Sequence, residues 1–115
     1  MLQSIKDTST ENIAEIMKAL GDKNRLHILS LLSRQELCVC EITAICHLSQ
    51  SNVSQHLSKL RSTGLVKERR NAQWIYYSIN SDTFPIVIEI LKLIPETAEE
   101  LSKLENFRNH PACKL

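Results

Sequence analysis

Cys38 and Cys40, separated by a single residue, are the side chains of this sequence best suited to chemistry. Thiolates bind soft ions in preference to hard cations. The candidate ions are As(III) and Sb(III), followed by Cd(II), Pb(II) and Bi(III). No histidine stands close to the pair in sequence, which disfavours a closed tetrahedral zinc site. The spacing therefore predicts a soft-ion site, and oxidation of the two thiols is the alternative chemistry.

The residues around the pair predict where a helix begins. Cys38 and Glu41 have the spacing of a capping box, although a thiol is a poorer hydrogen-bond acceptor than the usual hydroxyl. We expect the dipole of this helix to lower the pKa of the thiol and favour the thiolate. In a regular helix, side chains two positions apart point about 200° away from each other. Chelation of one ion therefore requires that Cys38 lies outside the helix, or that the first turn unwinds.

Composition and charge limit the classes of protein that can position such a pair. The chain has 115 residues, of which 43% are hydrophobic, with only 2 Gly and 3 Pro, and this predicts a single, mainly helical domain over 1–115. No apolar run is long enough to cross a bilayer and the N-terminus lacks a signal-peptide pattern, so we expect a cytoplasmic protein. Residues 49–79 carry a net charge of +4 in a chain whose total is +1. Nucleic acid is the first candidate partner for that basic segment.

The pattern over about residues 40–63 predicts a helix-turn-helix. The first helix would bury one apolar face, which holds Ile42, Ile45 and Cys46. A tight turn would follow at 47–49, and Ser49 would cap the second helix. The inward positions of this second helix are Val53, Leu57 and Leu60. Gly64 is placed to take the left-handed conformation that ends it, with Leu65 folding back as its apolar partner.

A β-hairpin is expected after the helix-turn-helix, over about residues 65–79. Two β-rich runs are separated there by Asn71, Ala72 and Gln73. This spacing fits a hairpin in which Asn71 tolerates the turn geometry. A mainly α fold with one small hairpin is typical of a winged helix-turn-helix.

Further helices flank this unit. Thr8 and Glu11 have the spacing of a capping box and predict a first helix over about 9–20, and Asp22 would cap a largely buried second helix. A helical region over about 83–107 is apolar on nearly every side of its first part. One small domain cannot cover that surface, so we expect this last helical region to form a dimer interface.

The second helix of the helix-turn-helix presents polar side chains outward, as a helix that reads DNA bases must. These candidate base-reading residues are Gln50, Ser51, Asn52, Ser54, Gln55 and His56. Cationic and polar residues nearby would contact phosphates and set the register. They are Lys59, Arg61, Arg69, Arg70 and Gln73. The expected partner is double-stranded operator DNA.

The segments GDKNRLHIL, ELCVCEI, LSQSNVSQHLSKLRSTGLV and NAQWIYYSI together resemble the ArsR/SmtB family of winged-helix repressors. The resemblance covers about half of the chain. It implies a homodimer, paired through its first and last helices, that sits on a palindromic operator and leaves it when a metal or metalloid binds. ELCVCEI is similar to the motif of the arsenite-responsive members, which would make Cys38 and Cys40 the principal thiolates.

A third sulfur ligand is not identified by the sequence. Some members of the family carry a cysteine three residues after the second one, and Thr43 occupies that position here. Cys46 and Cys113 are the remaining candidates, either from the same chain or from a partner. Cys46 falls on the buried face of its helix, where core packing is the favoured interpretation. Cys113 lies in a polar tail, where an ordinary free thiol is expected.

Several functions compete on these residues. The principal hypothesis is a transcriptional repressor that As(III), Sb(III) or another soft ion releases from its operator. The main alternative is a repressor of the same fold that responds to thiol oxidation or persulfide, because NAQWIYYSI is also similar to that branch of the family. A small thiol oxidoreductase, a protein-binding module and a family member whose thiols sense nothing are the others. No catalytic arrangement or phosphate-binding loop stands out, so we predict that the chain is not an enzyme.

The cysteine position predicts how sensing would act on DNA binding. An ion that pulls two divergent sulfurs together would distort the start of the helix that braces the base-reading helix. Ion binding and DNA binding would then oppose each other, and the opposition would be reciprocal.

Overall fold

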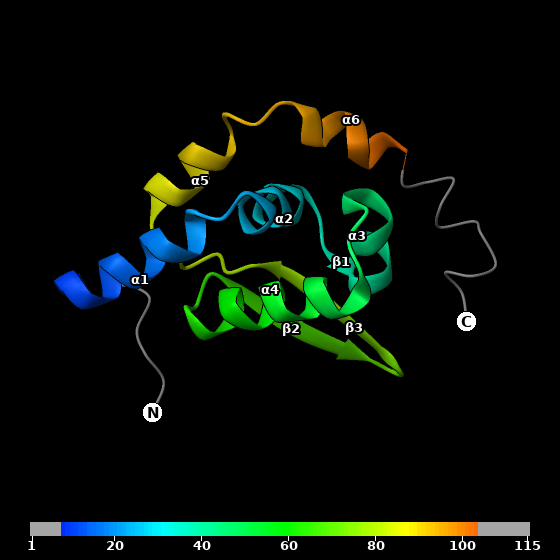
Figure 1. Ribbon diagram of the computed structural model, residues 1–115, viewed down its shortest axis with the longest axis horizontal. Coiled ribbons are helices and arrows are strands. Elements are labelled where there is room, and N and C mark those ends of the chain that lie inside the picture. Colours follow the sequence, from blue (N-terminus) through cyan, green and yellow to red (C-terminus); the bar gives the residue numbers. More distant parts are fainter. Residues whose placement is uncertain (1–7, 104–115) are drawn as a thin grey trace.

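The computed structural model describes residues 8–103 and is mainly helical, with one small sheet (Figure 1). In chain order its elements are α1 (Thr10–Leu20), α2 (Lys23–Arg34), β1 (Leu37–Cys38), α3 (Val39–Cys46), α4 (Gln50–Ser62), β2 (Val66–Asn71), β3 (Trp74–Ile79), α5 (Pro85–Leu91) and α6 (Glu96–Ser102). Figure 1 shows α2 in the middle, with α5 and α6 on one side and α4 with the hairpin on the other. This arrangement confirms the expected fold class of a mainly α domain with a β-hairpin wing.

The core forms around α2, which buries one whole apolar face. The Asp22 carboxylate accepts the backbone N–H groups of Asn24 and Arg25, as predicted for the cap of this helix. The buried apolar side chains of α2 are Ile28, Leu29, Leu31 and Leu32. Complete burial of one such side chain stabilises the fold by about 1.5–3 kcal/mol. α2 therefore anchors the helices that surround it.

The predicted helix-turn-helix is present as α3 and α4. His47 adopts a left-handed conformation in the turn, and the Ser49 hydroxyl accepts the N–H of Asn52 at 3.1 Å. The predicted inward positions Val53, Leu57 and Leu60 are buried. Gly64 has a φ of 81°, and the N–H of Leu65 reaches back to the carbonyl of Leu60 at 3.0 Å. This pair of features is the expected left-handed helix termination.

The first helix begins one residue later than predicted. Ser9, rather than Thr8, is the N-cap of α1, and its hydroxyl accepts the N–H of Asn12 at 3.2 Å. The expected capping box between Thr8 and Glu11 is therefore wrong. Both Thr8 and Ser9 carry the hydroxyl that a cap needs, so the residue type alone did not identify the position.

The sheet has a third strand that the sequence pattern did not predict. Its order is β1-β3-β2, with both pairs antiparallel. The hairpin itself is as expected, but its turn is shorter, because Asn71 pairs with Trp74. Ala72, rather than Asn71, holds the positive φ, at 57°. The prediction for Asn71 was wrong because cross-strand pairing keeps that residue in the strand.

The C-terminal region is helical, as expected, and is divided in two. α5 ends at Leu91, and α6 begins immediately after Pro95. Ser30 and Thr97 join α6 to α2 through a buried hydrogen bond. The last part of the predicted 83–107 region, together with Cys113, lies outside the described residues.

Three large apolar side chains of the described chain remain exposed. Met17 is 53% exposed on α1, Ile86 is 62% exposed on α5, and Leu93 is 78% exposed between α5 and α6. They come from the two regions expected to pair two copies of the chain. No helix within residues 8–103 has the length and apolar character needed to span a membrane.

Candidate soft-ion site and nucleic-acid interface

The two sulfurs of the candidate site are adjacent. Cys38 is the last residue of β1 and the N-cap of α3, with an extended backbone at φ −91° and ψ 169°. Cys40 lies in the first turn of α3, and its Sγ is 3.1 Å from the Sγ of Cys38. Of the two expected arrangements, the structure therefore has Cys38 outside the helix, and the first turn remains wound. The extended conformation of Cys38 is what turns its side chain towards that of Cys40.

The predicted capping box holds this geometry. The Glu41 carboxylate accepts the backbone N–H of Cys38 at 3.0 Å. In the same turn the Thr43 hydroxyl donates to the carbonyl of Cys40 at 2.8 Å. Glu41 is buried although it is a carboxylate, and this contact gives it a hydrogen-bond partner. The backbone on both sides of the sulfur pair is therefore fixed by side chains of α3 itself.

Burial reverses the expected shift of the Cys38 pKa. Cys38 is only 5% exposed, and this desolvation raises the pKa of its thiol. Hydrogen bonds from Cys40 and from the backbone of Glu41 act in the opposite direction but do not compensate. The expectation that the helix start would lower the pKa of the thiol is therefore wrong. A divalent ion that binds as a thiolate complex must displace a proton from Cys38.

A complete three-ligand site is not formed within the described part of the chain. No group of three or more His, Cys, Asp or Glu side chains among residues 8–103 is placed to hold one ion. The Sγ of Cys46 instead lies 3.7 Å from Nδ1 of His27, and Cys46 packs against the hydrophobic core. Burial raises the pKa of Cys46 to about 12. These observations favour the core-packing interpretation of Cys46, while Cys113 lies outside the described residues.

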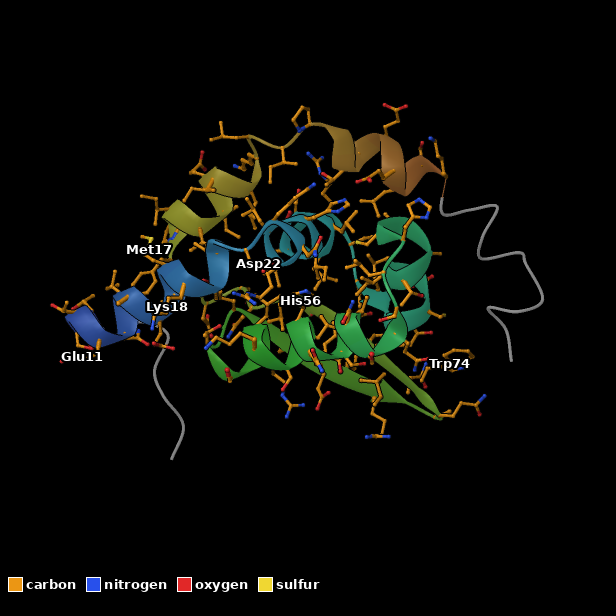
Figure 2. All side chains as sticks on the ribbon, viewed as in Figure 1. Glu11, Met17, Lys18, Asp22, His56 and Trp74 are labelled. Carbon is orange, nitrogen blue, oxygen red and sulfur yellow. The ribbon has the colours of Figure 1, made fainter. Side chains whose placement is uncertain are left out.

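The polar side chains of α4 lie on the surface, with one exception. The exposed residues among those predicted to read bases are Gln50, Ser51, Asn52, Ser54 and Gln55. His56 is half-buried, and Figure 2 shows it beside Asp22 at the start of α2. The N–H of Arg25 makes the largest contribution to the lowered pKa of Asp22, and His56 also contributes to it. His56 therefore differs in position from the other candidates.

Most of the predicted phosphate-binding cations are paired with carboxylates. Lys59 Nζ lies 3.4 Å from Glu15, and Arg61 forms an ion pair with Glu68. The remaining pair joins the wing to the start of β1: Arg69 donates to both carboxylate oxygens of Glu36, at 2.7 and 3.0 Å. Arg70 and Gln73 are exposed on the hairpin. Pairs of exposed charges are weak and exchange readily, so these cations remain candidates for phosphate contacts.

The sheet brings the sulfur pair and the wing together. Cys38 is directly opposite Tyr76 in the pair of β1 and β3, and Tyr76 is directly opposite Arg69 in the pair of β3 and β2. The guanidinium of Arg69 lies over the Tyr76 ring, 5.0 Å from its centroid. Sequence reasoning did not single out Glu36 or Tyr76. A two-residue strand leaves no periodic signal, so nothing in the pattern indicated that these residues meet.

Comparisons with known proteins agree with this arrangement. Residues 22–68 match the family model described as bacterial regulatory protein, arsR family. The chain is 37% identical over 86 residues to the arsenic resistance transcriptional regulator ArsR1 of Pseudomonas putida, a match that covers 74% of this chain and 67% of the relative. It is 40% identical over 93 residues to a transcriptional repressor SmtB homolog of Synechocystis, covering 81% of this chain and 66% of the relative. The matches thus span about two thirds of the length of each relative.

Similarity extends to solved structures. The chain superposes with a TM-score of 0.64 and 29% identity on the homodimeric winged helix-turn-helix DNA-binding domain Mb0332 of Mycobacterium bovis. That match covers 85% of this chain and 94% of the other. The Mycobacterium bovis protein is described as a possible ArsR-family transcriptional regulator. The coverage shows that the likeness includes the flanking helices as well as the helix-turn-helix.

Proposed function

Because the chain belongs to the arsR family of bacterial regulatory proteins, we propose that it is a homodimeric repressor whose inducer is a soft ion. In this proposal As(III) or Sb(III), and secondarily Cd(II), Pb(II) or Bi(III), binds to Cys38 and Cys40 and releases the protein from operator DNA. The family consists of transcriptional regulators, and the chain is not an enzyme. The identity of the ion, and of Cys38 and Cys40 as its ligands, goes beyond what membership of the family establishes.

The observation that carries the proposal is the 3.1 Å separation of the two sulfurs. Two sulfur ligands at about 2.3 Å from one ion can be at most about 4.6 Å apart. The pair therefore fits a shared ion without any rearrangement of the backbone. The further ligand that a three-coordinate ion requires would come from outside the described residues, from a partner chain or from solvent.

DNA binding would use α4 and the wing. The exposed polar side chains of α4 would enter the major groove, and Arg69, Arg70 and Gln73 of the wing would contact the DNA backbone beside it. Two copies would pair through α1 and the α5–α6 region, which carry the exposed Met17, Ile86 and Leu93. Burial of these side chains in a dimer removes apolar surface from water. The dimer would present two copies of α4 to a palindromic operator.

The adjacency of the sulfurs changes the mechanism expected from the sequence. An ion has no divergent sulfurs to pull together, because Cys38 and Cys40 already converge. Unwinding of the first turn of α3 is therefore not needed for binding. The ion would instead fix the junction of β1 and α3, at the base of both the helix-turn-helix and the wing.

The test measures operator affinity with and without arsenite for the wild type and for three serine variants. We expect Cys38→Ser and Cys40→Ser to bind the operator normally and to lose the arsenite response. Cys46→Ser is the matched control, because it removes a thiol from the same helix and should retain the response. Release of the Cys38→Ser or Cys40→Ser proteins by arsenite would contradict the proposed sensor site.

The short distance between the sulfurs also supports a second candidate, in which the same pair is oxidised. A disulfide bond is about 2.05 Å long, so the sulfurs would have to approach by about 1 Å. Each thiol would lose one proton and one electron to an oxidant such as a peroxide. Mass spectrometry after mild peroxide treatment distinguishes the two: a two-hydrogen loss accompanied by operator release, without any arsenite response, would favour oxidation.

A further inference from the structure

The contact between Glu36 and Arg69 connects the sulfur pair to the DNA-binding surface. Glu36 lies just before β1, two residues before Cys38, and its contact with Arg69 brings its carboxylate to the face of the sheet that carries the Arg69 side chain. Cys38, Tyr76 and Arg69 form one row across β1, β3 and β2. One face of the three-stranded sheet therefore runs from the sulfur pair to the wing.

The geometry of the pair matches that of a phosphate contact. Both Nε and a terminal nitrogen of Arg69 donate to the Glu36 carboxylate, at 3.0 and 2.7 Å. A guanidinium binds a phosphate with the same two-pronged geometry. A guanidinium engaged in this way with a carboxylate has few donors left in that direction. Glu36 and an operator phosphate are therefore competitors for Arg69.

We propose that Glu36 is a positioning residue that withdraws Arg69 from operator phosphate, and that soft-ion binding at Cys38 and Cys40 favours this withdrawn state. The inference rests on the proposed function and specifies how the same site regulates DNA binding. Glu36 contacts neither the ion nor the DNA; it acts through Arg69.

The length of β1 explains why ion binding favours the pair. β1 consists of Leu37 and Cys38 only, so Glu36 lies outside the register that pairs β1 with β3. Segments next to a paired strand open locally at a lower free-energy cost than the strand itself. An ion that bridges the sulfurs joins the end of β1 to the first turn of α3 and restricts this opening. The restriction raises the effective concentration of the Glu36 carboxylate next to Arg69.

The test compares Glu36→Gln with the matched control Glu68→Gln. Each substitution removes one carboxylate that is paired with an arginine, but Glu68 lies on β2 and pairs with Arg61. In the absence of ion, we expect Glu36→Gln to bind the operator about two- to fivefold more tightly, the range for loss of one exposed ion pair. Arsenite should lower the operator affinity of both proteins, but the decrease in the logarithm of the affinity should be at most half as large for Glu36→Gln as for the wild type. Glu68→Gln should retain the full arsenite response.

A second readout needs no DNA. The solvent exchange of the Arg69 Nε–H, followed by NMR, should slow when arsenite is added to the wild-type protein. It should be unaffected by arsenite in Glu36→Gln. An unchanged exchange rate in the wild type would overturn the inference.

The operator affinities in arsenite separate the proposed function from the proposed role of Glu36. If the wild type retains its operator affinity in arsenite, the proposed function fails. If the wild type is released and Glu36→Gln is released to the same extent, soft-ion sensing stands and the role of Glu36 is overturned.

Discussion

Cys38 and Tyr76 are directly opposite each other in the antiparallel pair of β1 and β3. The candidate ion ligand is thus part of the sheet that forms the wing, as well as the cap of α3. An aromatic cross-strand neighbour contributes about 0.2–1 kcal/mol to the stability of such a pair. The half-buried Tyr76 ring therefore supports the position of the sulfur.

Replacement of this ring should destabilise the protein. We expect Tyr76→Ala to lower the free energy of unfolding by about 1 kcal/mol, because it removes the cross-strand contact with Cys38. Tyr76→Phe keeps the ring and should be close to the wild type. Urea denaturation at fixed protein concentration measures both, and equal stability of the two variants would contradict the supporting role of the ring.

The hairpin turn should be improved by glycine at position 72. Ala72 has a φ of 57°, a conformation that costs a non-glycine residue about 1–2 kcal/mol. Glycine loses about 0.5–1 kcal/mol more than alanine through unfolded-state entropy. Ala72→Gly should therefore raise the free energy of unfolding by up to about 1 kcal/mol. Gln73→Gly is the control for the same denaturation experiment, and it should only destabilise, since Gln73 has no positive φ.

The Asp22 cap predicts a pH-dependent effect on stability. Asp22→Ala should lower the free energy of unfolding by about 1 kcal/mol at pH 7, whereas Asp22→Asn, which keeps an acceptor, should have a smaller effect. The pKa of Asp22 is lowered below its ordinary 3.8, mainly by the N–H of Arg25. A carboxylate with a lowered pKa in the folded state stabilises the protein above the unfolded pKa. The difference between wild type and Asp22→Ala should therefore shrink as pH falls below about 3.8.

Unfolding curves of the three proteins between pH 7 and pH 3 would check this. A constant difference between wild type and Asp22→Ala across that range would show that the charge of Asp22 has no part in the cap.

Cd(II) and arsenite should differ in the pH dependence of binding. Cd(II) displaces a proton from each protonated thiol, and burial keeps the pKa of Cys38 raised. Its affinity should therefore rise with pH, by up to about 100-fold per unit when both thiols are protonated. Arsenous acid, As(OH)₃, condenses with two thiols and releases two water molecules, so no net proton is exchanged. Its affinity should be nearly constant near pH 7.

Titrations followed by thiolate-to-metal absorption between pH 6 and pH 8 measure both dependences. Cys40→Ser should reduce the slope for Cd(II) by about half. A flat Cd(II) profile in the wild type would mean that the thiols are already ionised, contrary to the effect of burial on Cys38.

The exposed apolar side chain of Ile86 should be required for dimerisation. Ile86→Glu places a charge on a residue that is 62% exposed in the single chain, so the fold of one copy should persist. We expect the dimer dissociation constant to rise at least about tenfold, the equivalent of one buried apolar side chain. Glu89→Gln, also exposed on α5, is the control for sedimentation equilibrium. An unchanged dissociation constant for Ile86→Glu would place the interface elsewhere.

Local interactions were determined by the sequence itself. The caps at Asp22 and Ser49 and the left-handed Gly64 depend on hydrogen bonds that span two to five residues. Such contacts need only the right residue type at the right spacing, so these three could be predicted, whereas two adjacent hydroxyl residues at the start of α1 left its cap open to misassignment. The basic segment and the family motifs are equally local, which is why the fold class and the family were predicted correctly.

The chemistry of the sulfur pair was decided by the tertiary structure. Cys38 lies outside the helix because β1 pairs with β3, where its partner Tyr76 is 38 positions further along the chain. Its pKa is raised because burial desolvates the thiol, an effect that outweighs the hydrogen bonds from Cys40 and from the backbone of Glu41. Arg69 meets Glu36 only once the strands are in register. Burial and pairing between distant residues follow from the packing of the whole chain, which no local spacing of residues specifies.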